Sequence, residues 1–456
     1  MPARFGTDGV RGVANEELTA DLALALGRAT ARVLPAPTFV VGRDTRLSGP
    51  LLQAAFSAGL ATEGADVLDL GVLPTPGVAT VAVARGVPGA VISASHNPYP
   101  DNGIKLFSSF GTKLPVEVEA EIERELLAVS ADPDRPPARP TGLGVGRLSR
   151  DAVATEMYAA HLVGTLGGRR LDGMRVVVDC ANGAASVIAP RVLAEVGASV
   201  TSLHDAPDGV NINDGCGSTD PSELARVVVS SGADLGLALD GDADRVIAVD
   251  SAGEIVDGDV LLALFALDLA GRGELAGNTV AVTVMTNLGF RLAMEERGIA
   301  VLETDVGDRH VLAALDADGL SLGGEQSGHI IFRSQSTTGD GVLTGLALAD
   351  LMVRNGCPLA ELSAGLVERV PQRLVNVPIS RPERLADSAE VWDAVVEAEA
   401  TLGHTGRVLL RPSGTEPVVR VMVEARVEAQ ADAVAAQLAG VVEAALGRIE
   451  QPQDPA

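Results

Sequence analysis

Residues 89–98 read Gly-Ala-Val-Ile-Ser-Ala-Ser-His-Asn-Pro and join a short apolar run to a polar end. The run from Gly89 to Ile92 has the length and composition of a buried strand, and residues 97–103 carry the turn signals Asn-Pro and Pro-Asp-Asn-Gly. Ser95 therefore stands on a polar loop after a strand, directly before His96. A hydroxyl beside an imidazole in that place suits group transfer, although an ordinary serine-rich turn has the same composition.

Short Val/Ile-rich runs alternate with longer Ala/Leu/Glu-rich stretches along most of the chain. Before the serine loop, this pattern predicts helices at 18–34 and 51–63 and strands at 39–41 and 67–70. Such alternation is typical of βαβ units and of sheets that are mostly parallel. The last part differs, because two strands flank a polar loop there and a helix follows. We expect an α/β fold of three similar α/β domains with mostly parallel mixed sheets, plus a smaller C-terminal α+β domain.

A chain of 456 residues is long enough for several cores, and composition shifts suggest where they meet. Residues 131–149 are rich in Pro, Arg and Gly and are interpreted as a linker. The predicted domains are 1–148 with the serine loop, 149–251, 252–368 and 369–449, followed by a disordered tail at 450–456.

The charge balance of 35 basic against 61 acidic residues gives a net charge of −26. This charge disfavours nucleic acid and anionic membranes as partners. The cysteines Cys180, Cys216 and Cys357 form no CxxC pair, which suggests a reducing compartment and no structural zinc. The start of the chain lacks the apolar segment of a signal peptide, and its longest apolar run is too short to span a bilayer. We expect a cytoplasmic location.

A second polar loop, Asp-Gly-Asp-Ala-Asp-Arg, follows the apolar strand predicted at 235–239. Its carboxylates, Asp240, Asp242 and Asp244, alternate and would point to one side of an extended loop. Three like charges that close repel one another unless a cation lies among them, and Mg²⁺ prefers such oxygen ligands. The sequence therefore predicts a Mg²⁺ site, with a solvated acidic turn as the alternative.

A third loop, Gly-Gly-Glu-Gln-Ser-Gly-His at 323–329, leads into the strand predicted at 329–332. Glu325, Ser327 and His329 alternate, so their side chains could point together. Hydrogen-bonding groups beside an imidazole suit a polyol such as a sugar, whereas a plain glycine-rich turn is the alternative.

A fourth loop, Arg-Pro-Ser-Gly-Thr-Glu-Pro at 411–417, lies between the two strands of the last domain. A glycine-containing turn with hydroxyls, backbone N–H groups and arginine forms an anion-binding site, and phosphate is the anion that such a site typically binds. A capped hairpin turn is the alternative. The predicted phosphate-binding residues are Arg411, Ser413, Gly414, Thr415 and Arg420.

Two cations complete the pattern. Arg11 lies in Phe-Gly-Thr-Asp-Gly-Val-Arg-Gly at 5–12, a loop whose glycines allow close approach of a ligand. Lys105 follows Ser95 by ten residues, just past the turn. Both could act on a phosphoryl oxygen or a hydroxyl, although each taken singly resembles an ordinary surface cation.

These loops, in this order, resemble those of the α-D-phosphohexomutases over essentially the whole chain. The resemblance implies four domains around a central active-site cleft and phosphoryl transfer between two positions of a hexose phosphate. Ser95 would be a phosphoserine, and Mg²⁺ would bind Asp240, Asp242, Asp244 and the phosphoryl group on Ser95. A sugar 1,6-bisphosphate would be the intermediate, and glucosamine or glucose 1,6-bisphosphate would act as activator.

The resemblance also implies roles for the remaining residues. Arg11, Lys105 and His96 would be catalytic together with Ser95. The residues implied to bind the substrate are Arg245, Glu325, Ser327, His329, Arg411, Ser413, Gly414, Thr415 and Arg420. At Asp308 the chain departs from superfamily members that carry a catalytic His after the glycine matching Gly307, so that role is not transferred.

Within the superfamily, the opening motif, the Gln of the third loop and Val306-Gly307-Asp308-Arg309 resemble those of members that act on an amino sugar, and the resemblance implies such a substrate. The expected reaction interconverts glucosamine 6-phosphate and glucosamine 1-phosphate and supplies UDP-N-acetylglucosamine for cell-wall synthesis. A mutase acting on mannose or glucose phosphates is the alternative within the superfamily. A catalytically silent sugar-phosphate-binding protein is the alternative from another class. A homodimer is possible.

Overall fold

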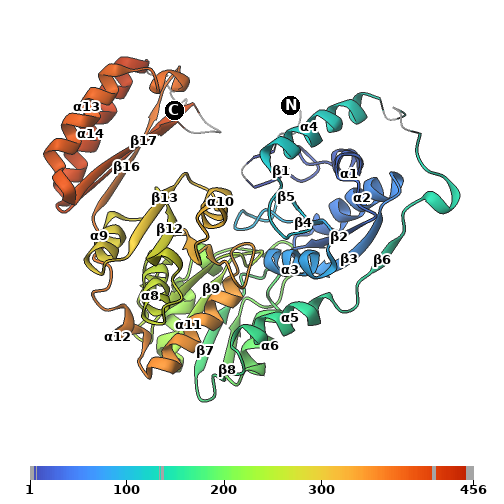
Figure 1. Cartoon of the computed structure of the whole chain (residues 1–456), viewed down its shortest axis with the longest axis horizontal. Coiled ribbons are helices and arrows are strands. Elements are labelled where there is room, and N and C mark those ends of the chain that lie inside the picture. The colour runs from blue at the N-terminus through green and yellow to red at the C-terminus, as the bar shows by residue number, and fades with distance from the viewer. Residues whose placement is uncertain (1–4, 7, 133, 135–137, 413–416, 448–456) are drawn as a thin grey trace, which may run out of the picture. The chain divides into compact units, whose positions relative to one another are not determined.

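The computed structural model describes residues 5–6, 8–132, 134, 138–412 and 417–447 (Figure 1). Its residues fall into two compact units, one from 1–285 with 299–366 and the other from 286–298 with 367–456. The first unit holds three mixed α/β sheets, and the second holds one smaller antiparallel sheet with helices. The predicted fold class is confirmed.

The first sheet has six strands in the order β1-β5-β4-β2-β3-β6. Its central strands run parallel, whereas β5 runs antiparallel to both β4 and β1. The strands are β1 (Val10–Val13), β2 (Thr38–Arg43), β3 (Asp66–Val72), β4 (Gly89–Ile92), β5 (Asp101–Phe107) and β6 (Leu148–Arg150). The helices are α1 (Ala20–Val33), α2 (Gly49–Thr62), α3 (Thr75–Arg85) and α4 (Val116–Ala131). In Figure 1, α1 and α2 lie on one side of this sheet and α3 on the other.

Helices α1 and α2 pack closely because Gly27 and Gly59 remove side chains at their crossing. A Cβ on Gly27 would lie 2.1 Å from the carbonyl oxygen of Phe56. The predicted linker at 131–149 is only partly irregular. It contains a 3-10 turn, η1 (Gly142–Gly144), and reaches β6, which pairs in parallel with β3. The first sheet therefore continues past the predicted domain limit at 148.

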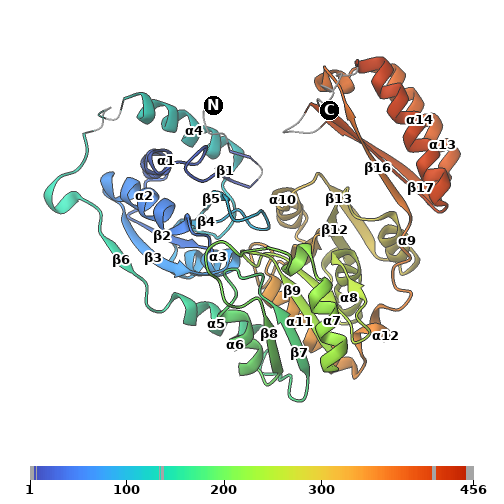
Figure 2. The same ribbon diagram turned by 180° about the vertical axis from the view of Figure 1, so that it is seen from behind.

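The second sheet has the order β11-β10-β9-β7-β8. Strands β7 to β9 are parallel, and β10 runs antiparallel to β9. The strands are β7 (Arg175–Asp179), β8 (Ser199–Leu203), β9 (Leu235–Leu239), β10 (Val246–Val249) and β11 (Ile255–Val256). The helices and turns are α5 (Ala154–Thr165), α6 (Ile188–Glu195), η2 (Gly217–Thr219) and α7 (Ser222–Ser231). Figure 2 shows α7 beside β9 and β7, against which it packs.

The third sheet has the order β13-β12-β14-β15. Strand β12 is parallel to β13 and β14, and β15 runs antiparallel to β14. The strands are β12 (Thr279–Thr283), β13 (Ala300–Thr304), β14 (Leu322–Gly324) and β15 (Ile330–Phe332). The helices and turns are α8 (Gly258–Gly271), η3 (Ala276–Asn278), α10 (Asp308–Asp318), α11 (Gly341–Asn355) and α12 (Leu359–Ser363). Among the described residues, no helix has both the length and the apolar character needed to cross a membrane.

Each of these three sheets presents one polar loop at the same topological position. The loop follows the parallel strand that borders the antiparallel part of the sheet and leads into the antiparallel strand beside it. The three loops are therefore β4–β5 with Ser95, β9–β10 with the aspartates, and β14–β15 with Glu325. Strands β4, β9 and β14 are buried throughout, which explains their uninterrupted apolar sequence.

The second unit has a three-stranded antiparallel sheet in the order β16-β18-β17. Helices α13 and α14 pack side by side against one face of it. Its elements are α9 (Leu288–Glu296), β16 (Gln372–Pro378), η4 (Pro382–Leu385), α13 (Ala389–Leu402), η5 (Gly403–Thr405), β17 (Gly406–Pro412), β18 (Val418–Ala425) and α14 (Glu428–Leu446). Strand β16 is not predicted from the sequence, because most of its residues are exposed or half-buried and it lacks a strong apolar pattern.

Residues 286–298, which the predicted third domain contains, belong to this second unit. The amide of Asn287 donates hydrogen bonds to the carbonyl oxygen of Val370 and to the carboxylate of Glu424, both at 2.9 Å. The guanidinium of Arg407 donates to the carbonyl oxygen of Thr286 at 2.5 Å. These contacts tie α9 to the antiparallel sheet.

Candidate active site

The Ser95 hydroxyl lies in a buried, constrained loop. Ser95 is 1% exposed, and its backbone φ of 52° is in the left-handed region that a residue with a side chain rarely adopts. Its Oγ donates a hydrogen bond to Oδ2 of Asp240 at 2.6 Å, across 145 residues of sequence. Nδ1 of His96 lies 3.3 Å from the same Oγ. The β4–β5 and β9–β10 loops therefore meet at this hydroxyl.

Close backbone contact between the two loops requires Gly241. A Cβ at this position would lie 2.6 Å from the carbonyl oxygen of Ser95. A side chain there would push the Ser95 loop away from Asp240 and Asp242. The glycine in the Asp-Gly-Asp sequence thus allows the two loops to come close to each other.

The predicted metal ligands converge. Asp240, Asp242 and Asp244 are all buried, and one carboxylate oxygen from each lies within 4.8 Å of the others. Oδ1 of Asp242 and Oδ1 of Asp244 are buried without a hydrogen-bond partner in the described part of the chain. A buried carboxylate oxygen without a donor is costly unless a cation binds it. The donor set and these two oxygens fit Mg²⁺.

The three carboxylates differ in acidity. Burial, together with the charges of Asp244 and Asp242, raises the pKa of Asp240 well above its usual value. Burial acts in the same direction on Asp244, but Lys105 and His329 outweigh it and hold its pKa well below the usual value. A cation among the carboxylates would favour the charged form of Asp240.

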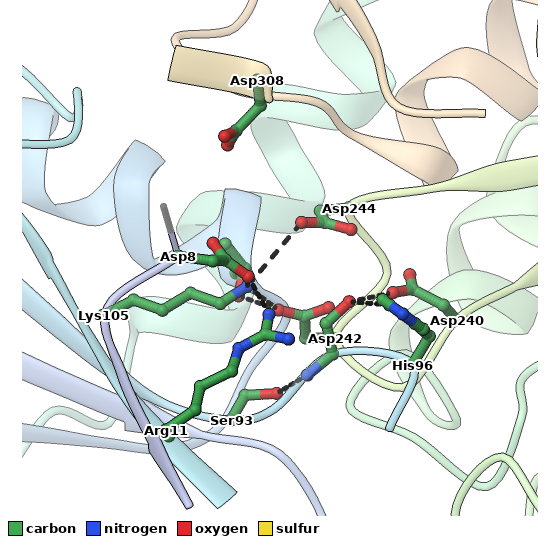
Figure 3. A network of polar contacts seen from close by, with 12 residues as sticks. Asp8, Arg11, Ser93, His96, Lys105, Asp240, Asp242, Asp244 and Asp308 are labelled. Carbon is green, nitrogen blue, oxygen red and sulfur yellow. Dashed lines mark hydrogen bonds and ion pairs between the residues drawn. The ribbon is translucent and has the colours of Figure 1, made fainter. Parts of the chain in front are cut away.

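Both predicted cations lie at the Asp loop (Figure 3). Nζ of Lys105, 2% exposed, lies 2.8 Å from Oδ2 of Asp242 and 3.2 Å from Oδ2 of Asp8. Burial opposes the charge on Lys105, but Asp242 and Asp244 outweigh it and raise its pKa. The guanidinium of Arg11 pairs with Asp8, and burial lowers its pKa. Lys105 is therefore held as an ammonium ion.

His96 is held uncharged beside Ser95. Burial, with the positive charges of Arg245 and Arg11, lowers the pKa of His96 to about 4. Near neutral pH the ring is therefore neutral and can accept a hydrogen bond at one nitrogen while it donates one from the other.

The third loop lies directly beside the Asp loop. The backbone N–H of Val246 donates to the carbonyl oxygen of Gly328 at 3.1 Å. His329 turns toward the metal ligands: its Nδ1 lies 3.6 Å from Oδ2 of Asp244, and its Nε2 accepts from the N–H of Gly339 at 3.0 Å. The side chain of His329 thus helps to hold the carboxylate of Asp244 in place.

The other two residues of the third loop have different surroundings. Oε1 of Glu325 accepts from the N–H of Gly307 at 3.2 Å. Oγ of Ser327 is buried and has no hydrogen-bond partner among the described residues. Nε of Arg245, another predicted substrate ligand, is also buried without a hydrogen bond in that part of the chain and lies 3.8 Å from Oδ1 of Asp244. Ser327 and Arg245 therefore retain hydrogen-bonding capacity for a ligand.

Asp308, where the chain departs from the superfamily pattern, forms an ion pair. Its Oδ1 lies 2.7 Å from Nζ of Lys113, which also lies 2.8 Å from Oδ1 of Asp8. Burial opposes ionisation of Asp308, but Lys113 and His329 outweigh it and lower its pKa. Asp308 is thus an ionised partner of Lys113, and His310 is exposed.

The structure adds supporting residues that the sequence analysis did not select. Thr75 donates from Oγ1 to Oδ2 of Asp242 at 2.6 Å, and its N–H donates to the Asp242 carbonyl at 3.0 Å. The amide of Asn213 donates to the carbonyl oxygen of Ser95 at 2.9 Å. Arg46 is fully buried, pairs with Asp44 at 2.8 Å and donates to several carbonyls of the Ser95 loop.

One signal could have pointed to some of these residues. Gly-Arg-Asp-Thr-Arg at 42–46 places a carboxylate and two guanidiniums directly after the buried β2, at the carboxyl end of a parallel strand. Functional groups gather at that edge of such sheets. Nothing local marks Thr75 or Asn213.

The second unit contains the predicted phosphate-binding residues. Arg411 of β17 lies directly opposite Arg420 of β18 in the antiparallel ladder. Burial and the charge of Arg420 lower the pKa of Arg411. Like charges opposite one another in a sheet repel, so an anion between them would be stabilising. The other predicted members of this site, Ser413, Gly414 and Thr415, lie outside the described residues.

Comparisons with known proteins agree with this architecture. Models of the phosphoglucomutase/phosphomannomutase family match alpha/beta/alpha domains I, II and III at residues 2–132, 156–253 and 257–370, and the C-terminal domain at 374–441. The chain is 27% identical to a solved phosphoglucomutase/phosphomannomutase family protein from Burkholderia thailandensis, with a TM-score of 0.82, covering 98% of this chain and 99% of that one.

Curated relatives narrow the assignment within the family. The chain is 54% identical to a phosphoglucosamine mutase of Corynebacterium jeikeium, over 97% of this chain and 99% of the relative. It is also 54% identical to a phosphoglucosamine mutase of Streptomyces griseus, over 98% of this chain and 100% of the relative. Identity at this level over both full lengths shows membership, and the chain belongs to the phosphoglucosamine mutases of the phosphoglucomutase/phosphomannomutase family.

Proposed function

We propose that this enzyme interconverts glucosamine 6-phosphate and glucosamine 1-phosphate through a phosphoryl group carried on Ser95. The observation that carries the mechanism is the buried Ser95 hydroxyl, 2.6 Å from Asp240 and surrounded by carboxylates and cations. The names of the relatives support the amino sugar as substrate. The expected role is to supply UDP-N-acetylglucosamine for cell-wall synthesis.

The reaction has two transfers at the same serine. In the first, the bond from phosphorus to Ser95 Oγ breaks while a bond forms to the free hydroxyl oxygen of the sugar phosphate. The proton lost by the sugar hydroxyl is balanced by the proton that Ser95 Oγ regains. The resulting 1,6-bisphosphate reorients and returns its other phosphoryl group to Ser95. His96, uncharged and 3.3 Å from Oγ, is placed to exchange the proton.

Lys105 and Arg11 stabilise the charge of the transferring group in this proposal. Both come from adjacent strands of the first sheet, because Arg11 pairs with Gly103 in the β1–β5 ladder. Their positive charges face the Asp loop, where the phosphoryl oxygens would lie. Fixed cations of this kind need no reorganisation as charge develops in the transition state.

Asp240, Asp242 and Asp244 would hold Mg²⁺ together with an oxygen of the phosphoryl group on Ser95. When bound, the metal ion offsets negative charge on the group being transferred. Thr75 and His329 hold the carboxylates of Asp242 and Asp244 in place.

The substrate makes its remaining contacts through the other predicted residues. Glu325 and Ser327 bind sugar hydroxyls or the 2-amino group, with Arg245 and His329 beside them. Arg411 and Arg420, with Ser413, Gly414 and Thr415, bind the phosphate that is not being transferred. A sugar 1,6-bisphosphate serves as intermediate and as the activator that phosphorylates Ser95.

An assay of three substrates tests this function. Purified enzyme with Mg²⁺ and glucose 1,6-bisphosphate is given glucosamine 6-phosphate, glucose 6-phosphate or mannose 6-phosphate. We expect the highest kcat/KM for glucosamine 6-phosphate, with slow turnover of the others, because one charge contact contributes only about 1 kcal/mol. An equal or higher kcat/KM for glucose or mannose phosphate would favour the alternative mutase. Absence of turnover and of phosphate on Ser95 would favour a silent binding protein.

The same proposal extends to the cellular location and the binding partners of the enzyme. We propose a cytoplasmic location, where its sugar-phosphate substrate and Mg²⁺ are available. We also propose that it binds neither nucleic acid nor membranes, because its net charge is −26. A homodimer stays a prediction that the mass of the protein in solution would test.

The domain limits drawn from the sequence also stay part of this proposal. Limited proteolysis tests them, because cleavage between compact domains is faster than cleavage within them.

A further inference from the structure

A second group of metal-ligating side chains lies in the second sheet, apart from the aspartates of the active site. It consists of Asp179 at the end of β7, His204 just after β8, and Cys216 just before η2. One ligand atom from each lies within 4.8 Å of the others. Asp179 and Cys216 are fully buried, and the side chain of His204 is 24% exposed.

The nitrogen and oxygen ligand atoms of this group lie close together without forming a hydrogen bond. Nδ1 of His204 lies 3.1 Å from Oδ1 of Asp179, a distance short enough for a hydrogen bond. The alignment for a hydrogen bond is absent, however, and Nδ1 is buried without a partner among the described residues. Two atoms bound to one metal ion would lie at about this spacing, since tetrahedral bonds of about 2.0 Å separate neighbouring ligand atoms by roughly 3.3 Å.

The surroundings of these side chains match those of metal ligands. Nε2 of His204, the ring nitrogen away from the cluster, lies 3.5 Å from a carboxylate oxygen of Glu223 on α7. A carboxylate behind the distal nitrogen is the usual way in which proteins orient a metal-binding histidine. The carboxylate of Asp179 is oriented by the N–H groups of Ala181 and Gly217, both at 2.9 Å. Each oxygen of a carboxylate keeps a second lone pair when it accepts one hydrogen bond.

We propose that Asp179, His204 and Cys216 form a binding site for Zn²⁺, with Glu223 orienting His204 and water completing the coordination. A donor set of one sulfur, one nitrogen and one oxygen favours a borderline-soft ion with tetrahedral geometry. Tetrahedral bonds of about 2.0 Å to nitrogen and oxygen and about 2.3 Å to sulfur place neighbouring ligands roughly 3.3–3.5 Å apart, so ligand atoms that now lie farther apart, up to 4.8 Å, would draw together around the ion. Mg²⁺ is a poor occupant because it prefers oxygen ligands.

The site is a structural one whose ion would stiffen the support of Ser95. Cys216 ends a loop that also carries Asn213, and Asn213 donates to the carbonyl oxygens of Ser95 and Asn97 at 2.9 and 3.1 Å. The N–H of Asn213 also donates to the carbonyl oxygen of Ala181, next to Asp179 and Cys180 in the chain. A metal bond to Cys216 would fasten this loop to the ends of β7 and β8. The CxxC spacing that usually marks zinc sites is absent because three separate segments provide the ligands.

Cobalt spectroscopy tests the site independently of mutase activity. The full-length protein is freed of metal with a chelator, brought into excess Mg²⁺ to fill the aspartate site, and titrated with Co²⁺. We expect a sulfur-to-cobalt charge-transfer band that saturates at one equivalent and is abolished by Zn²⁺. Co²⁺ at the aspartates has no sulfur ligand and cannot produce this band. Its absence from the unmodified protein would overturn the proposal, whatever the fate of any variant.

Variants identify the ligands. Cys216→Ser should lose the band, whereas Cys357→Ser and Cys180→Ser should keep it. Glu223→Gln should keep the band but weaken Zn²⁺ binding about 10- to 100-fold in competition with a chromophoric chelator. His204→Gln should weaken binding at least as much. A band that survives Cys216→Ser, or Zn²⁺ affinity unchanged in both Cys216→Ser and His204→Gln, would refute the assignment.

Discussion

Nη2 of Arg46 donates a hydrogen bond to the carbonyl oxygen of Ser95 at 2.8 Å, so a guanidinium holds the backbone of the residue proposed to carry the phosphate. The same nitrogen donates to Asn97 at 2.8 Å, Nη1 donates to Asp101 at 2.9 Å, and Nε pairs with Asp44 at 2.8 Å. Arg46 is 0% exposed. Nη1 also donates to the carbonyl oxygen of Pro98, so one planar guanidinium binds five groups that no single ammonium can reach together.

Arg46→Lys should consequently destabilise the protein and slow the reaction although the charge is kept. Buried acceptors left without a donor cost about 1–3 kcal/mol each, so a loss of roughly 2–5 kcal/mol in the free energy of unfolding is expected. Denaturant unfolding measures this loss. Arg333→Lys, at a half-exposed pair, is the matched control and should change stability by less than about 1 kcal/mol. Equal effects in the two variants would contradict the role given to Arg46.

Ser95→Ala should abolish mutase turnover and remove the phosphate from the protein, because no other carrier is expected. Ser93→Ala is the informative neighbour: its hydroxyl only holds the N–H of Ser95, at 3.0 Å, and Asp44, at 2.6 Å. That variant should turn over more slowly but remain phosphorylated. Intact-protein mass before and after phosphatase treatment, together with the rate, distinguishes the two. Wild-type turnover in Ser95→Ala would end the phosphoserine mechanism.

Asp242→Asn should raise the Mg²⁺ concentration needed for half-maximal activity and lower kcat strongly. One of three anionic ligands is lost, and Lys105 loses its closest partner, at 2.8 Å. Excess Mg²⁺ should restore part of the rate. Activity measured over a Mg²⁺ titration checks this, with Asp318→Asn on the exposed end of α10 as control. If a chelator leaves the wild-type rate unchanged, the three aspartates do not form the proposed metal site.

Arg420→Ala should raise KM for the sugar phosphate by at least tenfold while Ser95 remains phosphorylated by the bisphosphate. The reason is that a guanidinium–phosphate hydrogen bond contributes about 1.5–3 kcal/mol, and Arg411 and Arg420, which lie opposite each other, are proposed to share one anion. Arg373→Ala on β16 is the control, because it removes another cation of the same sheet. The Arg373 side chain pairs with Asp432 at 3.3 Å. The KM of this control variant should stay unchanged. Equal KM values for the wild type and Arg420→Ala would contradict the phosphate assignment.

Asp340→Asn should flatten part of the pH dependence of stability. Burial raises the pKa of Asp340 to about 7 from 3.8, although Leu343 N–H and Tyr158 donate to its carboxylate. The folded protein therefore keeps a proton that the unfolded chain releases, and this contribution to stability is lost as pH rises through about 7. The slope is at most about 1.4 kcal/mol per pH unit.

The measurement for Asp340 is the difference in unfolding free energy between variant and wild type across this range. The asparagine cannot ionise, and its oxygen can still accept from Leu343 at the start of α11. Its stability relative to the wild type should therefore increase from pH 4 to pH 7 by roughly 1–4 kcal/mol. A constant difference would show that Asp340 does not take up the proton.

Many strands, a few helices and the three polar loops of the first unit could be predicted from local sequence. Alternating apolar runs predicted the parallel strands, because a strand buried on both faces has few polar residues, as β4 and β9 show. Regular spacing predicted that Asp240, Asp242 and Asp244 converge. Strand β16 and the pairing of β6 with β3 could not be predicted, because short or half-exposed strands are stabilised by their neighbours more than by their own pattern.

The sequence by itself determined the fold class and the family, and it marked Ser95, the aspartates and the cations as candidates, because these depend on residue types in consecutive order. Tertiary structure alone decided which groups meet. Lys105 reaches Asp242 across 137 residues, Thr75 reaches it across 167, and Lys113 meets Asp308 across 195. Tertiary structure also places His329 beside Asp244 and brings Cys216 close to Asp179 and His204. Such contacts arise because separate loops pack at the ends of different sheets, and their distances are set by that packing and not by spacing along the chain.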